Sequence, residues 1–412
     1  MSSSASTAET TYRLDCGRSV FHGICEAGWV TFGLLIIIRY YEADAAMWSD
    51  TFAKSLIASA GFIGLLLTTF STNWVSRRGW PATKVIGGYL VVAGLLLVLT
   101  ASIENVTVFV ITFVLANIIS SQQAPLMTAT YASNYNAQER GKRVALALAI
   151  VAASSACFAW GGGWLLDQNF EQYPVLLLVM VGACWVNGAI VSRIPSQPIP
   201  RQESESAWGA LSWIWKDQLF GWLLSAKMLM GLANLMTLPI RVEILANPQY
   251  GIDASNMEVV LAAVVIPSVV RILSSKFFGV CFDRWNYVVW RVLVNSCFII
   301  GILLYFTSES LGWIYLGAAF VGMGMGGGAI SWNLWVTKIT KPENAAAYMS
   351  VHTTLTGIRG VIAPFLGYMI LHACTSRGLA MICVGAIVVS TLIYCALWKS
   401  PRLRNGNHVE AA

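Results

Sequence analysis

Five ionisable side chains stand inside stretches of sequence that are otherwise apolar, and chemistry is expected first from them. They are Glu26, Lys54, Lys227, Arg271 and Arg359. A charge at the centre of a membrane-spanning helix costs about 2.5–3.5 kcal/mol on insertion scales, so such residues usually serve a pathway, a ligand or a partner charge. Lys54 stands near the end of its stretch, where a long side chain can reach the interface, and we assign it no role.

Glu26 and Lys227 are expected at similar depth in the membrane. Glu26 stands seven residues after the start of its apolar stretch, and Lys227 stands nine residues after the start of its own. At about 1.5 Å per helical residue, these positions differ little in depth. The two side chains can therefore pair. Both a structural ion pair and a role in coupling stay open, because buried ion pairs also fix helix register.

Two histidines share a helix face with a charged residue. His22 precedes Glu26 by four residues, and the two can form a protonatable couple because imidazole titrates near neutrality. His22 can equally be an ordinary polar side chain near a helix end. His352 precedes Arg359 by seven residues, in a stretch with several threonines, glycines and a proline that predict a bent helix lining water or packed protein. Arg359 is then either an anion-binding or gating residue or a structural cation.

The composition requires most of the chain to face lipid or other apolar helices. Only 11% of the residues are charged, 57% are hydrophobic and the mean hydropathy is +0.65, whereas a soluble domain has about 25% charged residues. The apolar residues form twelve blocks of about the 20 residues that a transmembrane helix needs. The blocks are Ser19–Tyr40, Thr51–Trp74, Lys84–Ser102, Val106–Thr128, Arg143–Leu166, Tyr173–Ser192, Gln218–Ile240, Asn256–Phe282, Val288–Thr307, Gly312–Trp335, Ala345–Leu371 and Gly378–Trp398.

A polar linker divides the blocks into two groups of six and predicts the domain boundaries. We expect a tail at residues 1–18, a bundle at 19–192, a linker at 193–217, a second bundle at 218–398 and a tail at 399–412. With the N-terminus inside, the inner segments hold 18 Lys and Arg residues and the outer ones only Arg39, Arg241 and Arg377. This asymmetry predicts cytoplasmic termini in a plasma membrane or bacterial inner membrane.

The two halves contain a weak repeat and a short loop motif. At one offset, Ala159 aligns with Ala363 and Gly163 with Gly367, as in a duplicated six-helix unit. The loops after blocks two and eight both contain basic residues next to a helix end. Their motif residues are Arg78 and Gly79 in the first loop and Gly279, Asp283 and Arg284 in the second.

These loops resemble those of the major facilitator superfamily. That family has a Gly-x-x-x-Asp-Arg/Lys-x-Gly-Arg-Arg signature between helices two and three and a fainter copy between helices eight and nine. The fainter copy matches better here, because the first loop has Asn73 and Arg77 where the family has Gly and Asp. Asp283 can accept hydrogen bonds from the start of block five and hold the halves together, or it can be an ordinary loop charge.

The resemblance implies a membrane protein of two six-helix bundles, in which helices one, four, seven and ten line a central pathway. Helices one and seven would then face each other, which favours the pairing of Glu26 with Lys227. Polar and aromatic side chains on the four lining helices are candidates for solute contacts, although each can also serve helix packing. They are Trp29, Asn117, Gln122, Asn234, Trp332 and Asn333.

The sequence predicts a secondary transporter that moves a small organic solute by rocking its two bundles. Because Lys227, Arg271 and Arg359 outnumber Glu26, we expect an anionic or hydroxyl-rich solute. Proton coupling and uncoupled facilitation both stay open. We expect a monomer without cofactor, metal or nucleic acid. A membrane enzyme is disfavoured because no HExxH, GxSxG or DxxD pattern is present, whereas a receptor or scaffold on the same fold stays open.

Overall fold

A computed structural model describes residues 2–41, 49–198, 211–340 and 342–404. Twelve helical stretches of this part are long and apolar enough to cross a membrane, which confirms the all-α prediction with twelve spans. The stretches are Ser6–Arg39, Asp50–Thr68, Ala82–Ser102, Val106–Asn134, Glu139–Gln168, Phe170–Val191, Gln218–Ala246, Asn256–Arg284, Tyr287–Thr307, Leu311–Trp332, Ala347–Ala373 and Ser376–Ala396.

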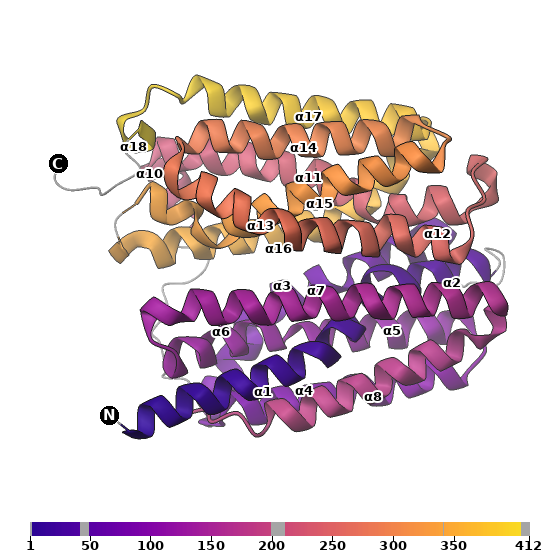
Figure 1. Cartoon of the computed structure of the whole chain (residues 1–412), viewed down its shortest axis with the longest axis horizontal. Helices are drawn as coiled ribbons and strands as arrows, with labels where there is room; N and C mark the ends of the chain where they lie inside the picture. Colours follow the sequence, from indigo (N-terminus) through magenta and orange to yellow (C-terminus); the bar gives the residue numbers. More distant parts are fainter. Residues whose placement is uncertain (1, 42–48, 199–210, 341, 405–412) are drawn as a thin grey trace. The chain divides into compact units, whose positions relative to one another are not determined.

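The helices form two compact units (Figure 1). Unit 1 is Met1–Gln202 with Leu245–Val265, and unit 2 is Glu203–Ile244 with Ile266–Ala412. The helices of unit 1 are α1 (Ser2–Ala27), η1 (Gly28–Phe32), α2 (Gly33–Arg39), α3 (Asp50–Arg78), α4 (Ala82–Ser102), α5 (Val106–Ser121), α6 (Gln123–Asn134), α7 (Ala137–Gln168), η3 (Phe170–Gln172), α8 (Tyr173–Val191), η4 (Pro248–Tyr250), α12 (Asn256–Val260) and η5 (Leu261–Val265). Those of unit 2 are α10 (Trp213–Lys216), α11 (Gln218–Ala246, whose end enters unit 1), α13 (Ile266–Arg284), α14 (Tyr287–Thr307), α15 (Leu311–Leu334), η6 (Trp335–Lys338), α16 (Pro342–Ala373), α17 (Ser376–Ala396) and α18 (Pro401–Arg404).

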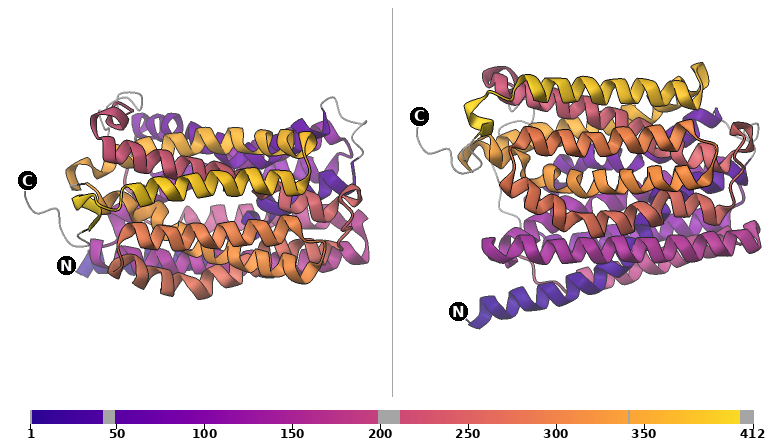
Figure 2. Two further views of the ribbon diagram at one scale, coloured as in Figure 1. Left: turned by 90° about the horizontal axis from the view of Figure 1, so that it is seen from above. Right: turned by 45° about the horizontal axis from the view of Figure 1, so that its top comes forward.

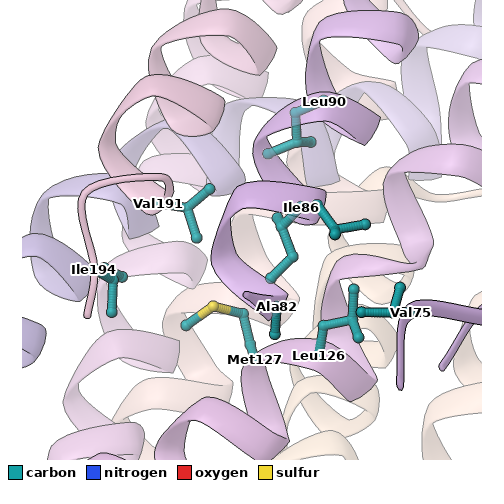
Figure 3. Close-up of a cluster of buried hydrophobic side chains, with 9 residues drawn as sticks. Val75, Ala82, Ile86, Leu90, Leu126, Met127, Val191 and Ile194 are labelled. Atoms are coloured by element: carbon teal, nitrogen blue, oxygen red, sulfur yellow. The ribbon is translucent and has the colours of Figure 1, made fainter. Parts of the chain in front are cut away.

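In unit 1, long helices pack along each other in pairs. The helix α4 lies along α8, and α1 lies along α7 (Figure 1). Glycines permit close contact between α4 and α8. A Cβ atom at Gly188 would lie only 3.2 Å from the carbonyl oxygen of Gly87, so a larger residue there would crowd the neighbouring backbone. One buried apolar cluster joins α3, α4, α6 and the end of α8 (Figure 3). Its residues are Val75, Ala82, Val85, Ile86, Leu90, Leu126, Met127, Val191 and Ile194.

In unit 2, α15 packs against both α13 and α14, and α14 also packs against α17 (Figure 2). The glycine run of α15 permits these two contacts. A Cβ atom at Gly322 would lie 2.7 Å from the carbonyl oxygen of Pro267 on α13, and one at Gly324 would lie 2.9 Å from the ring of Phe298 on α14. Small residues on α15 therefore let its backbone approach two neighbours at once.

Several spans have irregular turns next to candidate site residues. The first span passes from α1 into the π-helix η1, which contains Trp29, before it continues as α2. The fourth span is interrupted at Gln122, between α5 and α6. A second π-helix, η5, separates α12 from α13. Such local departures from α-helical geometry are frequent at functional sites.

Candidate functional site

Two of the charged residues singled out in the sequence lie side by side in unit 2. The ammonium group of Lys227, on α11, is buried and donates hydrogen bonds to the hydroxyl (2.8 Å) and the carbonyl oxygen (3.3 Å) of Ser331 on α15. It also lies 5.0 Å from the ring centre of Trp335, in a cation–π contact. The Nη1 atom of Arg359, on α16, donates to the carbonyl oxygen of Lys227 over 2.9 Å. Three helices therefore bring these two cations together.

His352 lies beside them, enclosed by tryptophans. Its side chain is fully buried, and its ring centre lies 4.7 Å from that of Trp332 and 5.6 Å from that of Trp335. In the part of the chain that the structure describes, neither ring nitrogen of His352 has a hydrogen-bond partner. The hydroxyl of Thr356, one turn further along α16, is buried and also without a partner there. This part of α16 thus has hydrogen-bonding groups that its own unit leaves unused.

Arg291, for which the sequence predicts an inner-loop position, adds a further cation. It lies in the first turns of α14, is only 2% exposed, and its guanidinium is 5.6 Å from the ring centre of Tyr394. It interacts electrostatically with Lys227, His352 and Arg359. We call Lys227, Arg291, His352 and Arg359 the basic cluster.

The basic cluster has no carboxylate to balance its charge within its own unit. Among the described residues of unit 2, no Asp or Glu oxygen lies within 4.0 Å of the side-chain nitrogens of Lys227, Arg291 or Arg359. The ion pairs found there involve other cations, namely Arg377 with Glu309 and Arg402 with Asp217. Within the described part of unit 2, the charge of the cluster is therefore not balanced by a carboxylate, which is unusual for buried cations.

A pocket of about 370 Å³ opens beside the cluster in unit 2. Six Leu, Ile and Met side chains form most of its wall, and Ser225 and Arg359 are its polar residues. Arg359 belongs to both the pocket and the basic cluster, so the pocket reaches the cluster at this one cation. An apolar cavity with a few polar groups is the usual form of a small-molecule site.

In unit 1, the predicted protonatable couple lies on α1. Glu26 and His22 are both partly buried, and the Nδ1 atom of His22 is a buried atom without a partner in the described chain. Trp29, in η1, packs edge-on against Phe113 with ring centres 5.0 Å apart. The expected pairing of Glu26 with Lys227 would join the two units, and it stays a prediction.

A buried ionic network in the middle of α1 was missed in the sequence. Asp15 is 1% exposed, and its Oδ1 atom accepts hydrogen bonds from Arg18 Nε (2.8 Å) and from the Tyr131 hydroxyl (2.8 Å). Arg18 also donates to the Tyr131 hydroxyl (2.8 Å) and to Gln123 Oε1 (3.4 Å). The sequence predicts Asp15 and Arg18 to lie in a tail, but α1 already begins at Ser2. The three-residue spacing of an acid and a base was the available signal.

Four of the polar candidates on the lining helices make local contacts. Gln122 donates from Nε2 to the carbonyl oxygen of Gly64 (2.8 Å), and Asn234 accepts from Arg241 on its own helix (3.0 Å). Asn117 is buried with its Oδ1 atom near Gly61. Trp332 packs against His352, as described above. The side chain of Asn333 lies outside the described part of the structure.

Arg271 is partly buried on α13. Its carbonyl oxygen accepts hydrogen bonds from the hydroxyls of Ser274 and Ser275 one turn later. The structure thus brings Lys227 and Arg359 into contact, whereas the hydrogen bonds described for Arg271 involve its backbone carbonyl on α13.

Most of the sequence matches a family model. A sequence model described as the Major Facilitator Superfamily matches residues 23–364. The chain belongs to the major facilitator superfamily. This confirms the resemblance seen in the loop motifs, and it identifies the twelve-span chain as a member of a transporter family rather than of an enzyme family. No curated protein matches the sequence.

Solved structures of this superfamily share the fold. The nucleoside transporter NupG is 13% identical with a TM-score of 0.71, over 94% of this chain and 99% of that one. The D-xylose-proton symporter is 13% identical with a TM-score of 0.72, over 97% and 99%. A bacterial homolog of the human lysosomal transporter Spinster, in an inward-facing and occupied conformation, is 12% identical with a TM-score of 0.65, over 95% and 96%. Identities this low establish the fold and not the solute.

The superfamily loop motifs lie at helix ends in this structure. Gly79 ends α3 with φ of +65°, a left-handed conformation that glycine adopts without steric cost. The guanidinium of Arg78 lies 6.0 Å from the ring centre of Trp74 and 5.8 Å from that of Trp80. Gly279, Asp283 and Arg284 belong to the end of α13, where Asp283 and Arg284 are exposed. The expected clasp between Asp283 and the start of α7 would join the two units and stays a prediction.

Proposed function

We propose that this protein is a secondary transporter that moves a small organic solute across a membrane by alternating access of its two units. Membership of the superfamily supports transport, and the basic cluster beside an apolar pocket is the observation that supports a solute site in unit 2. Charged groups kept inside membrane-spanning helices are costly and usually functional. The solute would shift the balance between inward-open and outward-open states by its different affinity for the two.

The solute is anionic or hydroxyl-rich in this proposal. The protein acts as a monomer in a plasma membrane or bacterial inner membrane, with both termini in the cytoplasm. The nucleoside and D-xylose named for two similar structures are the first uncharged solutes to test. Glu26 and His22 are the candidates for proton coupling, because they are partly buried ionisable groups on one face of the first span. Uncoupled facilitation is the alternative, and a receptor or scaffold role is the competing function.

The test begins with the purified full-length protein. Ligands are first found by the rise in melting temperature that they cause in a screen of metabolites, since a ligand of the folded state stabilises it. Each ligand is then offered in radiolabelled form to liposomes with and without the protein. We expect protein-dependent, saturable uptake. Ligands that bind without any uptake would instead support a receptor.

A further inference from the structure

We propose that the basic cluster of unit 2 binds the oxyanion group, a carboxylate or a phosphate, of an organic solute whose apolar part occupies the adjoining pocket. This inference rests on the proposed transport function and selects the anionic solute over the hydroxyl-rich one.

The charge of the cluster favours an anion. Lys227 is 5% exposed and Arg291 is 2% exposed, and Arg359 interacts electrostatically with Arg291 and Lys227. In the described residues of unit 2, no carboxylate lies within 4.0 Å of these three side chains. Removing cations from water and placing them together without counter-charge is unfavourable. A bound anion supplies the missing charge, and an uncharged solute does not.

The unsatisfied hydrogen-bonding groups are mostly donors. Buried atoms without partners in the described chain include the Nε atoms of Arg291 and Arg359 and the Nε1 atom of Trp335. Each of these is an N–H group that can only donate. The ring of His352 adds another donor, since one of its two unpartnered nitrogens bears a hydrogen in neutral imidazole. The complement to such a set is a group with several acceptor lone pairs, as an oxyanion has.

The pocket determines what kind of anion fits. Its wall is mostly Leu, Ile and Met side chains, and its volume is about 370 Å³. The Arg359 side chain lies in this wall and also contacts Lys227. A solute with its charged group at Arg359 would therefore place an apolar body against the remaining wall. We infer an organic anion with an apolar part rather than inorganic phosphate or a sugar acid.

Gly231 provides a way to move Arg359 without removing its charge. A Cβ atom at Gly231 on α11 would overlap the guanidinium of Arg359. Because the guanidinium is the far end of a flexible side chain, it can shift away while the helices stay in place. Gly231→Ala should then displace this cation, whereas Arg359→Gln removes it.

The experiment measures binding to the purified full-length protein in phosphatidylcholine nanodiscs, by titration calorimetry. The probes are matched pairs of anions and uncharged analogues: benzoate and benzamide, hexanoate and hexanamide, phenyl phosphate and phenol. We expect at least one anion to bind and its uncharged partner to bind at least tenfold more weakly. Both Arg359→Gln and Gly231→Ala should weaken binding of the anion by roughly 10- to 100-fold, as expected for the loss of a hydrogen bond to a charged group. Arg377→Gln, which changes an exposed ion pair with Glu309, should leave binding unchanged.

Several outcomes would overturn the proposal. One is equal binding of the anions and their uncharged partners. Another is an anion affinity that neither Arg359→Gln nor Gly231→Ala changes. A third is the absence of binding by every anion of the panel. The melting temperature of each ligand-free variant shows whether it has folded. If Arg359→Gln does not fold, Gly231→Ala still tests the site, because it keeps every charge of the protein. If the anion binds in phosphatidylcholine nanodiscs but not in nanodiscs that contain phosphatidylglycerol, the site holds a lipid headgroup instead. Uptake of an uncharged solute without anion binding refutes only the anion site, whereas anion binding without uptake refutes only transport.

Discussion

The ammonium group of Lys227 on α11 donates a 2.8 Å hydrogen bond to the hydroxyl of Ser331 on α15, and both side chains are buried. Ser331→Ala removes this acceptor and should reduce the free energy of unfolding by about 1.5–3 kcal/mol, the usual value for a hydrogen bond to a charged group. Unfolding in mixed micelles of increasing SDS fraction measures the loss. In a Lys227→Met background the same substitution should cost far less. Equal costs in the two backgrounds would show that the hydrogen bond contributes nothing.

The second prediction concerns Asp217, which precedes α11 and joins three segments of unit 2. Its carboxylate accepts hydrogen bonds from Arg402 (2.8 and 3.0 Å), from the Tyr348 hydroxyl (2.7 Å) and from the Phe220 amide (3.2 Å). Burial raises the pKa of Asp217, but the hydrogen bonds from Arg402, Tyr348 and Phe220 outweigh it, so the pKa lies below its ordinary value. A lowered pKa in the folded state stabilises the fold above the unfolded pKa of about 3.9.

This stabilisation should be lost as the pH falls through the lowered pKa. Asp217→Asn should reduce the free energy of unfolding by about 1 kcal/mol at pH 7, a modest value because Arg402 is partly exposed. The difference from wild type should shrink below about pH 4. Glu309→Gln, in an exposed ion pair with Arg377, is the matched control and should have little effect. A difference that stays constant from pH 7 to pH 3 would contradict the assignment.

The third prediction concerns Asp167 near the end of α7 in unit 1. Its two carboxylate oxygens accept hydrogen bonds from the backbone amides of Asn256 (2.7 Å) and Met257 (3.0 Å), which begin α12. The loss of such a cap typically costs about 1 kcal/mol. Asp167→Ala should therefore speed hydrogen exchange of these two amides about fivefold. Glu171→Ala replaces an exposed acid in the next turn and should leave this exchange unchanged. Equal exchange rates in wild type and Asp167→Ala would refute the cap.

The fourth prediction concerns Glu26, and it rests on the proposed transport function. If the partly buried Glu26 carboxyl binds the coupling proton, Glu26→Gln should flatten the dependence of uptake on pH, because glutamine does not titrate. Initial uptake rates into liposomes between pH 5 and pH 8 measure this. Glu139→Gln, at an acid that is 57% exposed beside Arg143, serves as the control for removing a carboxylate from unit 1. An unchanged profile in Glu26→Gln would remove Glu26 from coupling.

The fold was largely predictable from the sequence because lipid imposes strong rules. Twelve blocks of suitable length and hydropathy reappear as twelve spans, since the backbone must satisfy its hydrogen bonds within helices in a bilayer. The isolated charges Lys227 and Arg359 were found for the same reason, because a cation is conspicuous in an apolar stretch. Their contact was not predicted, since it depends on which faces of α11 and α16 meet.

Charges near helix ends were harder to interpret. The sequence predicts loop positions for Arg291 and Arg241, but they are 2% and 4% exposed. Arg241 reaches back along its own helix to Asn234, and Asp15 is buried against Arg18 in an extension of α1. Counting charges along a chain gives their distance from a helix end, but it does not show whether that end is covered by neighbouring helices.

The central claim is that the protein carries a solute through a site open to one side at a time. Counterflow tests it most directly: liposomes are preloaded with an excess of the unlabelled ligand and diluted into a trace of the labelled one. We expect the preloaded vesicles to accumulate the label transiently above its external concentration, as a carrier exchanges one solute for the other. The account would be contradicted if the label inside the vesicles never exceeded its external concentration. This result counts only in vesicles shown to contain folded protein that binds the ligand.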